Sequence, residues 1–307
     1  MDFQQPIEVR LFLTMALQID PIQIDAQLRA LLSPETAQTL ATGQRYLLPG
    51  NMVWHGWGPE DAPTLVLLHG GSGSWTHWIQ NIAPLLADGY RVLAIDLPGF
   101  GDSDSPDKGG DADALVEPLH AAWQHMKRHD NNVFMGFSFG GMTAALWLAA
   151  YPQDAKELVL VGAPGFGLAS PQRTPLKGWR HLPTEALQAQ AHRHNLLGLM
   201  LHDEANLDDL AMRLHVLNVV RDRMTRRRLA STPVLVQTMP HITCPVHVIY
   251  GEFDAFYLDR LPEVAHMFKQ LTPHLVSWQL VKGMGHWVQY ESPSKFQRAL
   301  KHTLSLV

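Results

Sequence analysis

The stretch from Val133 to Gly141, VFMGFSFGG, decides how this sequence folds. A short β-branched and aromatic run reaches Gly136, and good helix formers follow Gly140. The pattern G-x-S-x-G between a strand and a helix predicts a tight turn that lifts the hydroxyl of Ser138 clear of the backbone. Gly136 and Gly140 are expected there because a Cβ at either position would collide with the neighbouring strand or helix. The alternative is a glycine-rich turn without chemistry.

A carboxylate and a histidine follow this turn along the chain, so that the order is serine, aspartate, histidine. This order is typical of catalytic serines that lie on such a turn. Asp254 ends YGEFD at 250–254, directly after an apolar run, and His286 lies in GMGHW at 283–287. A serine hydroxyl needs a base to take its proton, and the base needs an acid to fix its tautomer. We therefore predict Ser138 as nucleophile, His286 as base and Asp254 as acid. The alternatives are a turn aspartate and one structural histidine among 17.

Two backbone N–H groups are candidates for an oxyanion hole. The N–H of Phe139 follows the nucleophile at the start of the predicted helix. The N–H of Gly71 lies in the loop after the buried-looking run LVLLH at 65–69. The tetrahedral intermediates of acyl transfer need such donors. The alternative for this loop is a turn that merely needs glycine.

Five motifs in this order resemble the α/β-hydrolase superfamily, over about residues 44–307. They are HGGSG at 69–73, DLPGFGDS at 96–103, GFSFGG at 136–141, GEFD at 251–254 and GMGHW at 283–287. The resemblance implies an α/β-hydrolase fold with a mostly parallel eight-stranded sheet, flanking helices and an inserted helical cap. It also implies that Asp96 organises its own loop. Haloalkane dehalogenases and epoxide hydrolases resemble the chain less, because they carry aspartate where Ser138 stands.

Apolar runs and helical patterns alternate along most of the chain. Runs such as RVLAID at 91–96 lack a period of two, which is typical of parallel strands covered on both faces. The expected organisation is an N-terminal helical extension at 1–43, a core at 44–163 and 241–307, and a helical cap at 164–240. Helical spacing in the extension begins near Asp20, and Ser33 is expected to cap a second helix. Candidates for lining a pocket beneath the cap are Phe166, Leu196, Met200, Leu217 and Trp287.

Composition argues against several classes of function. The net charge is −5 without a basic stripe, and we interpret the arginines at 226–228 as a solvated helix face, so nucleic acid is not an expected partner. No apolar run approaches a membrane-spanning length. The single cysteine, Cys244, suits a reducing compartment, and we expect a cytoplasmic protein. No zinc, phosphate-loop or dinucleotide motif is present, so we expect no metal and no cofactor. A small-molecule substrate is expected, and a homodimer stays open.

Three interpretations of the function remain open. The first is hydrolysis of a carboxylic ester or similar acyl bond of a small, largely apolar substrate through an acyl-enzyme. The second is carbon–carbon bond hydrolysis, because GHWVQYESPSKFQRAL at 285–300 is similar to the end of the meta-cleavage-product hydrolases. That similarity implies substrate contacts for Trp287 and for Arg193, whose guanidinium would pair with a carboxylate. The alternative for Arg193 is an exposed helical arginine. The third interpretation is a non-catalytic ligand-binding protein with this fold.

Overall fold

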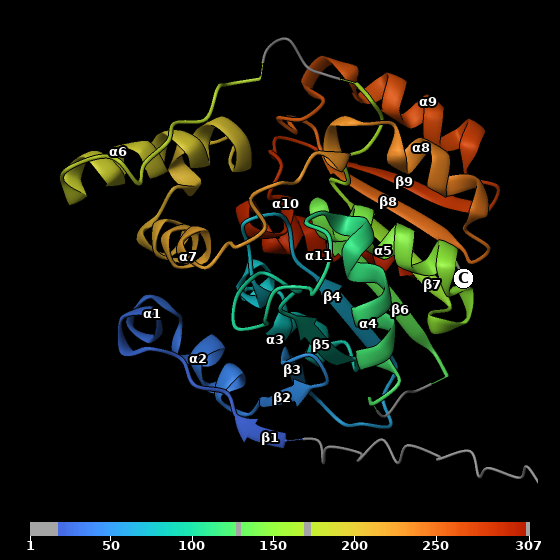
Figure 1. Cartoon of the computed structure of the whole chain (residues 1–307), viewed down its shortest axis with the longest axis horizontal. Coiled ribbons are helices and arrows are strands. Elements are labelled where there is room, and N and C mark those ends of the chain that lie inside the picture. The colour runs from blue at the N-terminus through green and yellow to red at the C-terminus, as the bar shows by residue number, and fades with distance from the viewer. Residues whose placement is uncertain (1–17, 127–129, 169–172, 305–307) are drawn as a thin grey trace, which may run out of the picture.

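A nine-stranded sheet forms the centre of the molecule (Figure 1). The computed structural model describes residues 18–126, 130–168 and 173–304. The sheet order is β1-β2-β3-β5-β4-β6-β7-β8-β9. The strands are β1 (Gln18–Pro21), β2 (Gln44–Leu48), β3 (Met52–Trp57), β4 (Thr64–Leu68), β5 (Arg91–Ile95), β6 (Asn132–Phe137), β7 (Glu157–Val161), β8 (Val246–Gly251) and β9 (Leu275–Val281). Strands β4 to β9 pair in parallel, and β1, β2 and β3 form an antiparallel edge. This is the α/β-hydrolase fold that the motifs predict.

The expected strand count of eight was wrong, because the N-terminal extension supplies a strand. β1 pairs antiparallel with β2, with Gln18 opposite Leu47. The helix expected from Asp20 begins only at Ala26, after Asp25 accepts a hydrogen bond from the Leu28 N–H. A proline disfavours helical backbone at the residue before it, and the open edge of β2 offers unpaired hydrogen-bonding groups. Both effects favour an extended start to this segment.

Helices cover both faces of the sheet. They are α1 (Ala26–Leu31), α2 (Pro34–Ala41), α3 (Ile82–Ala87), α4 (Val116–Trp123), α5 (Phe139–Ala150), α6 (Glu185–Asn195), α7 (Asp209–Val220), α8 (Val234–Thr238), α9 (Leu261–Leu271), α10 (Val288–Glu291) and α11 (Pro293–Leu304). Side chains of α4, α5, α8 and α9 join one apolar core, and those of α3, α10 and α11 join the other. Along β4, Val66 faces the first core and Leu67 the second, as strand geometry requires.

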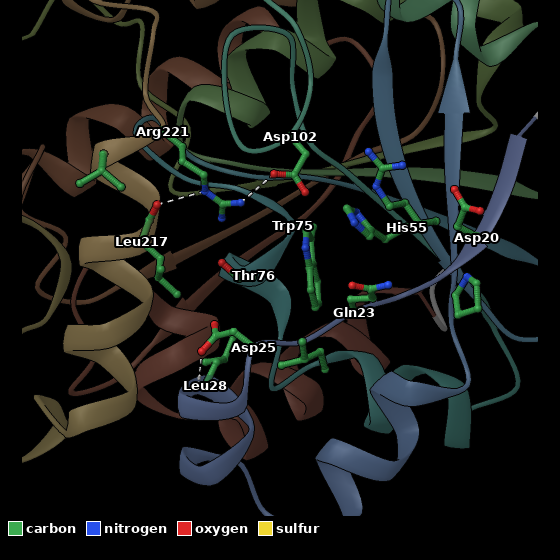
Figure 2. Close-up of a pocket in the computed structure, with 14 residues that line it drawn as sticks. Asp20, Gln23, Asp25, Leu28, His55, Trp75, Thr76, Asp102, Leu217 and Arg221 are labelled. Atoms are coloured by element: carbon green, nitrogen blue, oxygen red, sulfur yellow. Dashed lines mark hydrogen bonds and ion pairs between the residues drawn. The ribbon is translucent and has the colours of Figure 1, made fainter.

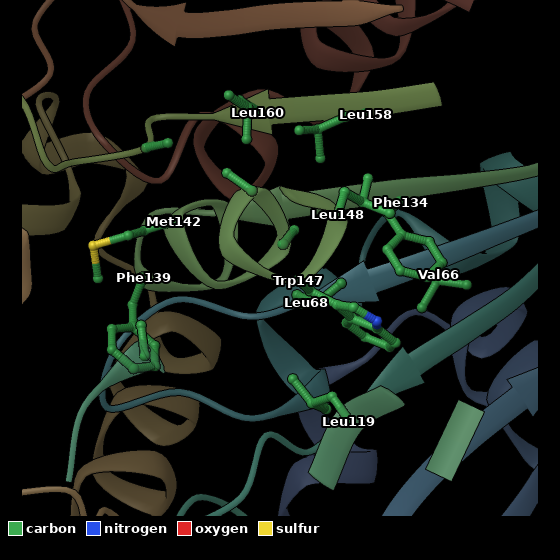
Figure 3. Packing of buried hydrophobic residues seen from close by; sticks show 14 of the residues in the cluster. Val66, Leu68, Leu119, Phe134, Phe139, Met142, Trp147, Leu148, Leu158 and Leu160 are labelled. Atoms are coloured by element: carbon green, nitrogen blue, oxygen red, sulfur yellow. The ribbon is translucent and has the colours of Figure 1, made fainter. Parts of the chain in front are cut away.

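The helix that follows Ser138 is packed from all sides. Nine of the twelve residues of α5 are buried. Figure 3 shows Trp147 and Leu148 of α5 against Phe134 of β6, and the Trp147 and Phe134 rings lie 4.6 Å apart. Interiors packed this densely hold their side chains in single rotamers. The first turn of α5, and with it the turn at Ser138, is therefore held in place by the core.

The segment 164–240 lies between β7 and β8 and holds α6, α7 and α8. In Figure 1, α6 and α7 stand apart from the sheet, with α7 next to α1. α6 continues into a π-helical turn at Leu196–Met200, and α7 ends at Val220. The expected helical character of this segment is therefore confirmed for α6 and α7. Within the described ranges, no helix is both long and apolar enough to cross a bilayer.

Candidate active site

Ser138 occupies a strained turn between β6 and α5. Its φ is 51° and its ψ is −119°, a backbone conformation that non-glycine residues rarely adopt. Its N–H donates to the Val161 carbonyl at 2.7 Å. A Cβ on Gly136 would lie 2.4 Å from the Gly140 carbonyl oxygen, and a Cβ on Gly140 would lie 2.4 Å from that of His69. Both glycines are therefore required by close backbone approach, as the sequence predicts.

The structure brings His286 and Asp254 together. Nδ1 of His286 lies 2.7 Å from Oδ2 of Asp254, and both side chains are buried. The second carboxylate oxygen accepts the Phe256 N–H at 2.9 Å. The rings of Phe137 and Phe256 lie 4.9 and 4.7 Å from the His286 ring. Nδ1 faces the carboxylate, so Nε2 is the ring nitrogen left for chemistry, and His286 and Ser138 line the same pocket.

Two buried histidines shape the glycine loop after β4. The Leu97 N–H donates to Nε2 of His69 at 3.0 Å, so the ring proton is on Nδ1 and is donated to the Gly70 carbonyl at 2.7 Å. The Gly70 N–H donates to Nδ1 of His77 at 3.2 Å. Burial lowers the pKa of His69 to about 4 and the pKa of His77 well below its usual value. Both rings are therefore neutral near pH 7, and sequence reasoning assigned a role to neither.

The N–H groups of Gly71 and Phe139 are oriented by this loop and by the start of α5. Among the described residues, neither N–H donates a hydrogen bond within the protein. A Cβ built on Gly71 would lie 3.6 Å from Cβ of Phe139, so the two residues are neighbours. Two N–H groups without a partner in the protein, on neighbouring residues beside Ser138, are suited to bind a developing oxyanion.

Asp96 holds its loop, as the family resemblance implies. Oδ1 accepts the Trp75 N–H at 2.8 Å, and Oδ2 accepts the Asp102 N–H at 3.0 Å. Burial raises the pKa of the Asp96 carboxyl. The side chain is fully buried and its oxygens are occupied by backbone donors, so it is a structural residue.

The pocket at Ser138 has a volume of about 250 Å³. Loops of the core form one wall, and the segment 164–240 forms the other. The lining residues are Gly70, Gly71, Ser72, Phe137, Ser138, Phe139, Pro164, Arg173, Leu176, Leu199, Met200, Arg227, Ala230, Ser231, Phe256 and His286. The guanidinium of Arg173 lies 4.3 Å from the centre of the Phe256 ring. The interpretation of the arginines at 226–228 as a solvated helix face is wrong for Arg227, which lies beyond the end of α7 and lines this pocket.

Most of the predicted substrate contacts lie elsewhere. Arg193 forms an ion pair with Glu204 at the surface, with 48% of its side chain exposed, and does not line the pocket. Trp287 is buried, and its Nε1 donates to the His77 carbonyl at 3.0 Å. Of the five candidates for pocket lining, Met200 alone lines it. Helical spacing predicts which faces of a helix are apolar, but it does not determine which of these faces points to Ser138.

A larger cavity of about 670 Å³ lies away from Ser138 (Figure 2). It is bounded by the N-terminal extension, by His55 of β3, by Trp75 and by Leu217 of α7. Burial lowers the pKa of His55 to about 3, and its ring lies 5.0 Å from that of Trp75. The proposed catalytic side chains do not contact this cavity, so size alone does not identify the active site. No cluster of three or more metal-ligating side chains occurs in the described parts of the chain.

Comparisons with known proteins place this geometry among hydrolases. The family described as alpha/beta hydrolase fold matches residues 63–199. A 2-hydroxy-6-oxononadienedioate/2-hydroxy-6-oxononatrienedioate hydrolase of Cupriavidus pinatubonensis is 28% identical over 262 residues, which is 77% of this chain and 85% of that protein. A 2-hydroxy-6-oxo-6-phenylhexa-2,4-dienoate hydrolase of Burkholderia cepacia is 27% identical over 250 residues, which is 76% of this chain and 85% of that protein.

Solved structures show the same fold. The carboxylesterase CesB (YbfK) of Bacillus subtilis has a TM-score of 0.70 and 20% identity, and the match covers 91% of this chain and 98% of that one. The esterase RhEst1 of Rhodococcus sp. ECU1013 has a TM-score of 0.66 and 21% identity, covering 87% and 100%. At 20% and 21% identity, these likenesses show the fold alone.

Proposed function

Because this chain is a hydrolase of the α/β-hydrolase superfamily, we propose that it cleaves a carboxylic ester or similar acyl bond of a small molecule with Ser138, His286 and Asp254. The observation that carries the proposal is the buried His286–Asp254 pair beside the strained turn at Ser138. Such a pair supplies a base of fixed tautomer, and such a turn exposes the hydroxyl to substrate.

The reaction follows from these positions. His286 Nε2 takes the proton of the Ser138 hydroxyl, and the oxygen attacks the substrate carbonyl. The N–H groups of Gly71 and Phe139 stabilise the oxyanion that forms. The imidazolium then protonates the leaving alkoxide, and an acyl-enzyme remains. A water molecule, activated by the same imidazole, hydrolyses the acyl-enzyme and restores the serine.

The segment 164–240 is proposed as a cap that selects the substrate. Its residues Leu176, Leu199 and Met200 give the pocket an apolar wall opposite the core loops. The volume of about 250 Å³ suits a short acyl group or a single ring. A cytoplasmic location and a homodimer stay proposals, to be checked by cell fractionation and by sedimentation of the purified protein.

Carbon–carbon bond hydrolysis of a dienoate diketone is the second candidate, and Arg173 favours it. This guanidinium lines the pocket and, among the described residues, has no ion-pair partner. An arginine in that position can bind a substrate carboxylate through two hydrogen bonds. The two curated relatives named above act on dienoate or dienedioate compounds by their names. The role first predicted for Arg193 is therefore proposed for Arg173.

One set of assays tests both candidates. A fluorophosphonate probe should label the wild-type protein and leave Ser138→Ala unlabelled. Initial rates with p-nitrophenyl esters and with dienoate diketones then rank the two reactions, with Ser138→Ala as the background. Equal labelling of both proteins, or turnover that persists in Ser138→Ala, would contradict the nucleophile and leave a ligand-binding role as the better interpretation.

A further inference from the structure

Asp222, directly after α7, joins the glycine loop to the segment 164–240. Its Oδ2 accepts the hydroxyl of Ser72 at 2.5 Å. Arg227 donates to both oxygens of this carboxylate, from Nη1 to Oδ1 at 2.8 Å and from Nη2 to Oδ2 at 2.9 Å. Nη2 also donates to the Ser72 hydroxyl at 3.1 Å. A two-pronged guanidinium–carboxylate contact fixes orientation as well as distance.

The network formed by Ser72, Asp222 and Arg227 is largely shielded from water, and the backbone of Met224 adds two further hydrogen bonds to it. The Asp222 and Arg227 side chains are 12% and 22% exposed, so solvent screens their ion pair less than a surface pair. The Met224 N–H donates to Asp222 Oδ1 at 2.9 Å, and Arg227 Nη1 donates to the Met224 carbonyl at 2.7 Å. Each donor and acceptor in this set therefore restrains the others.

The network lies next to both residues whose N–H groups are proposed for the oxyanion hole, Gly71 and Phe139. Ser72 follows Gly71 directly and has a φ of 52°, which a serine rarely adopts without a specific contact. The guanidinium of Arg227 lies 5.6 Å from the centre of the Phe139 ring, within the range of a cation–π contact. A Cβ on Gly71 would lie 3.6 Å from Arg227 Nε.

We infer that Asp222 is a positioning residue: with Arg227 it holds Ser72 in its left-handed conformation and so aims the Gly71 N–H at the oxyanion. This inference rests on the proposed acyl transfer at Ser138. Asp222 does not line the Ser138 pocket, so its effect passes through Ser72 and the backbone of the glycine loop. The charge of Arg227 is neutralised by its ion pair with Asp222. Arg227 is therefore not proposed to bind a substrate carboxylate, unlike Arg173 on the same wall.

The inference is tested with Asp222→Asn and Ser72→Ala in the full chain. Each should lower kcat for a neutral p-nitrophenyl ester roughly tenfold or more and change KM less than about twofold, because the contact acts on the transition state. Phenylboronic acid, which forms a tetrahedral adduct with an active-site serine, should lose affinity by the same factor as kcat. The double variant should be no slower than the slower single variant, since both changes break one network.

Asp102→Asn is the matched control. Asp102 accepts from Arg221 Nη1 at 3.0 Å, in a more exposed ion pair that also ties the end of α7 to a core loop (Figure 2). This variant should keep wild-type kcat. An equal loss in Asp102→Asn would mean that attachment of the segment, and not the network, matters, and would overturn the inference.

Other outcomes separate this inference from the proposed function. Multiplicative losses in the double variant, or a rise in KM with unchanged kcat, would overturn the positioning role. If Asp222→Asn does not fold, Ser72→Ala decides alone, because it removes a single oxygen. If the wild type shows no turnover that depends on Ser138, the proposed function fails first. If it does, and Ser72→Ala has wild-type kcat, only the inference fails.

Discussion

The two walls of the Ser138 pocket are built in different ways. On the core side, His286 and Asp254 are 2% and 0% exposed, and backbone groups or aromatic rings hold each side chain. On the other side, Arg173 is exposed and leans on one ring, while Arg227 depends on an ion pair with Asp222. Reacting groups need preorganised positions, whereas groups that select substrates can adapt. We propose that the core wall carries the reacting groups and that Arg173, on the wall formed by 164–240, selects the substrate, while Asp222 and Arg227 of that second wall support the glycine loop of the first.

Removing a reacting group should give the largest effect. Ser138→Ala should lower kcat by about 10⁴-fold or more, and Asp254→Asn by about 10³- to 10⁴-fold, because the base loses its tautomer and its counter-charge. Initial rates with a p-nitrophenyl ester measure both. Thermal unfolding should show that both variants stay folded. Activity of Asp254→Asn near the wild-type level would contradict the role of Asp254 as the acid that orients His286.

A methyl group added in the turn at Ser138 should destabilise the fold of the core wall. Gly140→Ala places a Cβ 2.4 Å from a backbone oxygen, and we expect a loss of about 3 kcal/mol in the free energy of unfolding. Gly71→Ala is the control, since its nearest contact would be 3.6 Å, an ordinary van der Waals distance. Urea unfolding of the two variants should differ clearly. Equal stability would mean that the turn relaxes more easily than its packing indicates.

Acid should lower the free energy of unfolding of the protein through His69, which holds the glycine loop of the core wall. Burial lowers the pKa of His69 to about 4 in the folded state, against about 6.5 when unfolded. As the pH falls, His69 takes up a proton in the unfolded chain before it does so in the folded protein. The contribution of neutral His69 to the free energy of unfolding is therefore complete above about pH 6.5 and is lost as the pH falls towards 4. The contribution lost by pH 5 is about 2 kcal/mol. Urea unfolding at pH 7 and pH 5 should show a smaller pH dependence in His69→Gln than in the wild type.

The smallest expected effect concerns the selective wall. Arg173→Ala should raise KM for a carboxylate-bearing substrate about tenfold, a loss of about 1.4 kcal/mol, and leave neutral esters within about twofold. Arg193→Ala is the matched control and should change neither, because Arg193 pairs with Glu204 at the surface. If Arg173→Ala reduces turnover of both substrate types equally, Arg173 supports the wall and does not select substrates.

The sequence by itself determined the features that short-range sterics and chain order control. The turn at Ser138 follows from glycines two residues on either side of it, and the alternation of strands and helices follows from local apolar patterns. The contact between His286 and Asp254 could be predicted because both lie in loops that follow parallel strands, at one edge of one sheet.

Tertiary structure alone decided the rest. Ser72 and Asp222 are 150 positions apart, and no periodicity in either segment relates them. Arg173 faces the pocket and Arg193 faces solvent, although both are arginines of the same inserted segment. β1 exists because the edge of β2 is open to pairing, a property of the finished sheet. Contacts between distant segments depend on how these segments pack, and a single sequence records only the packing faces and not their partners.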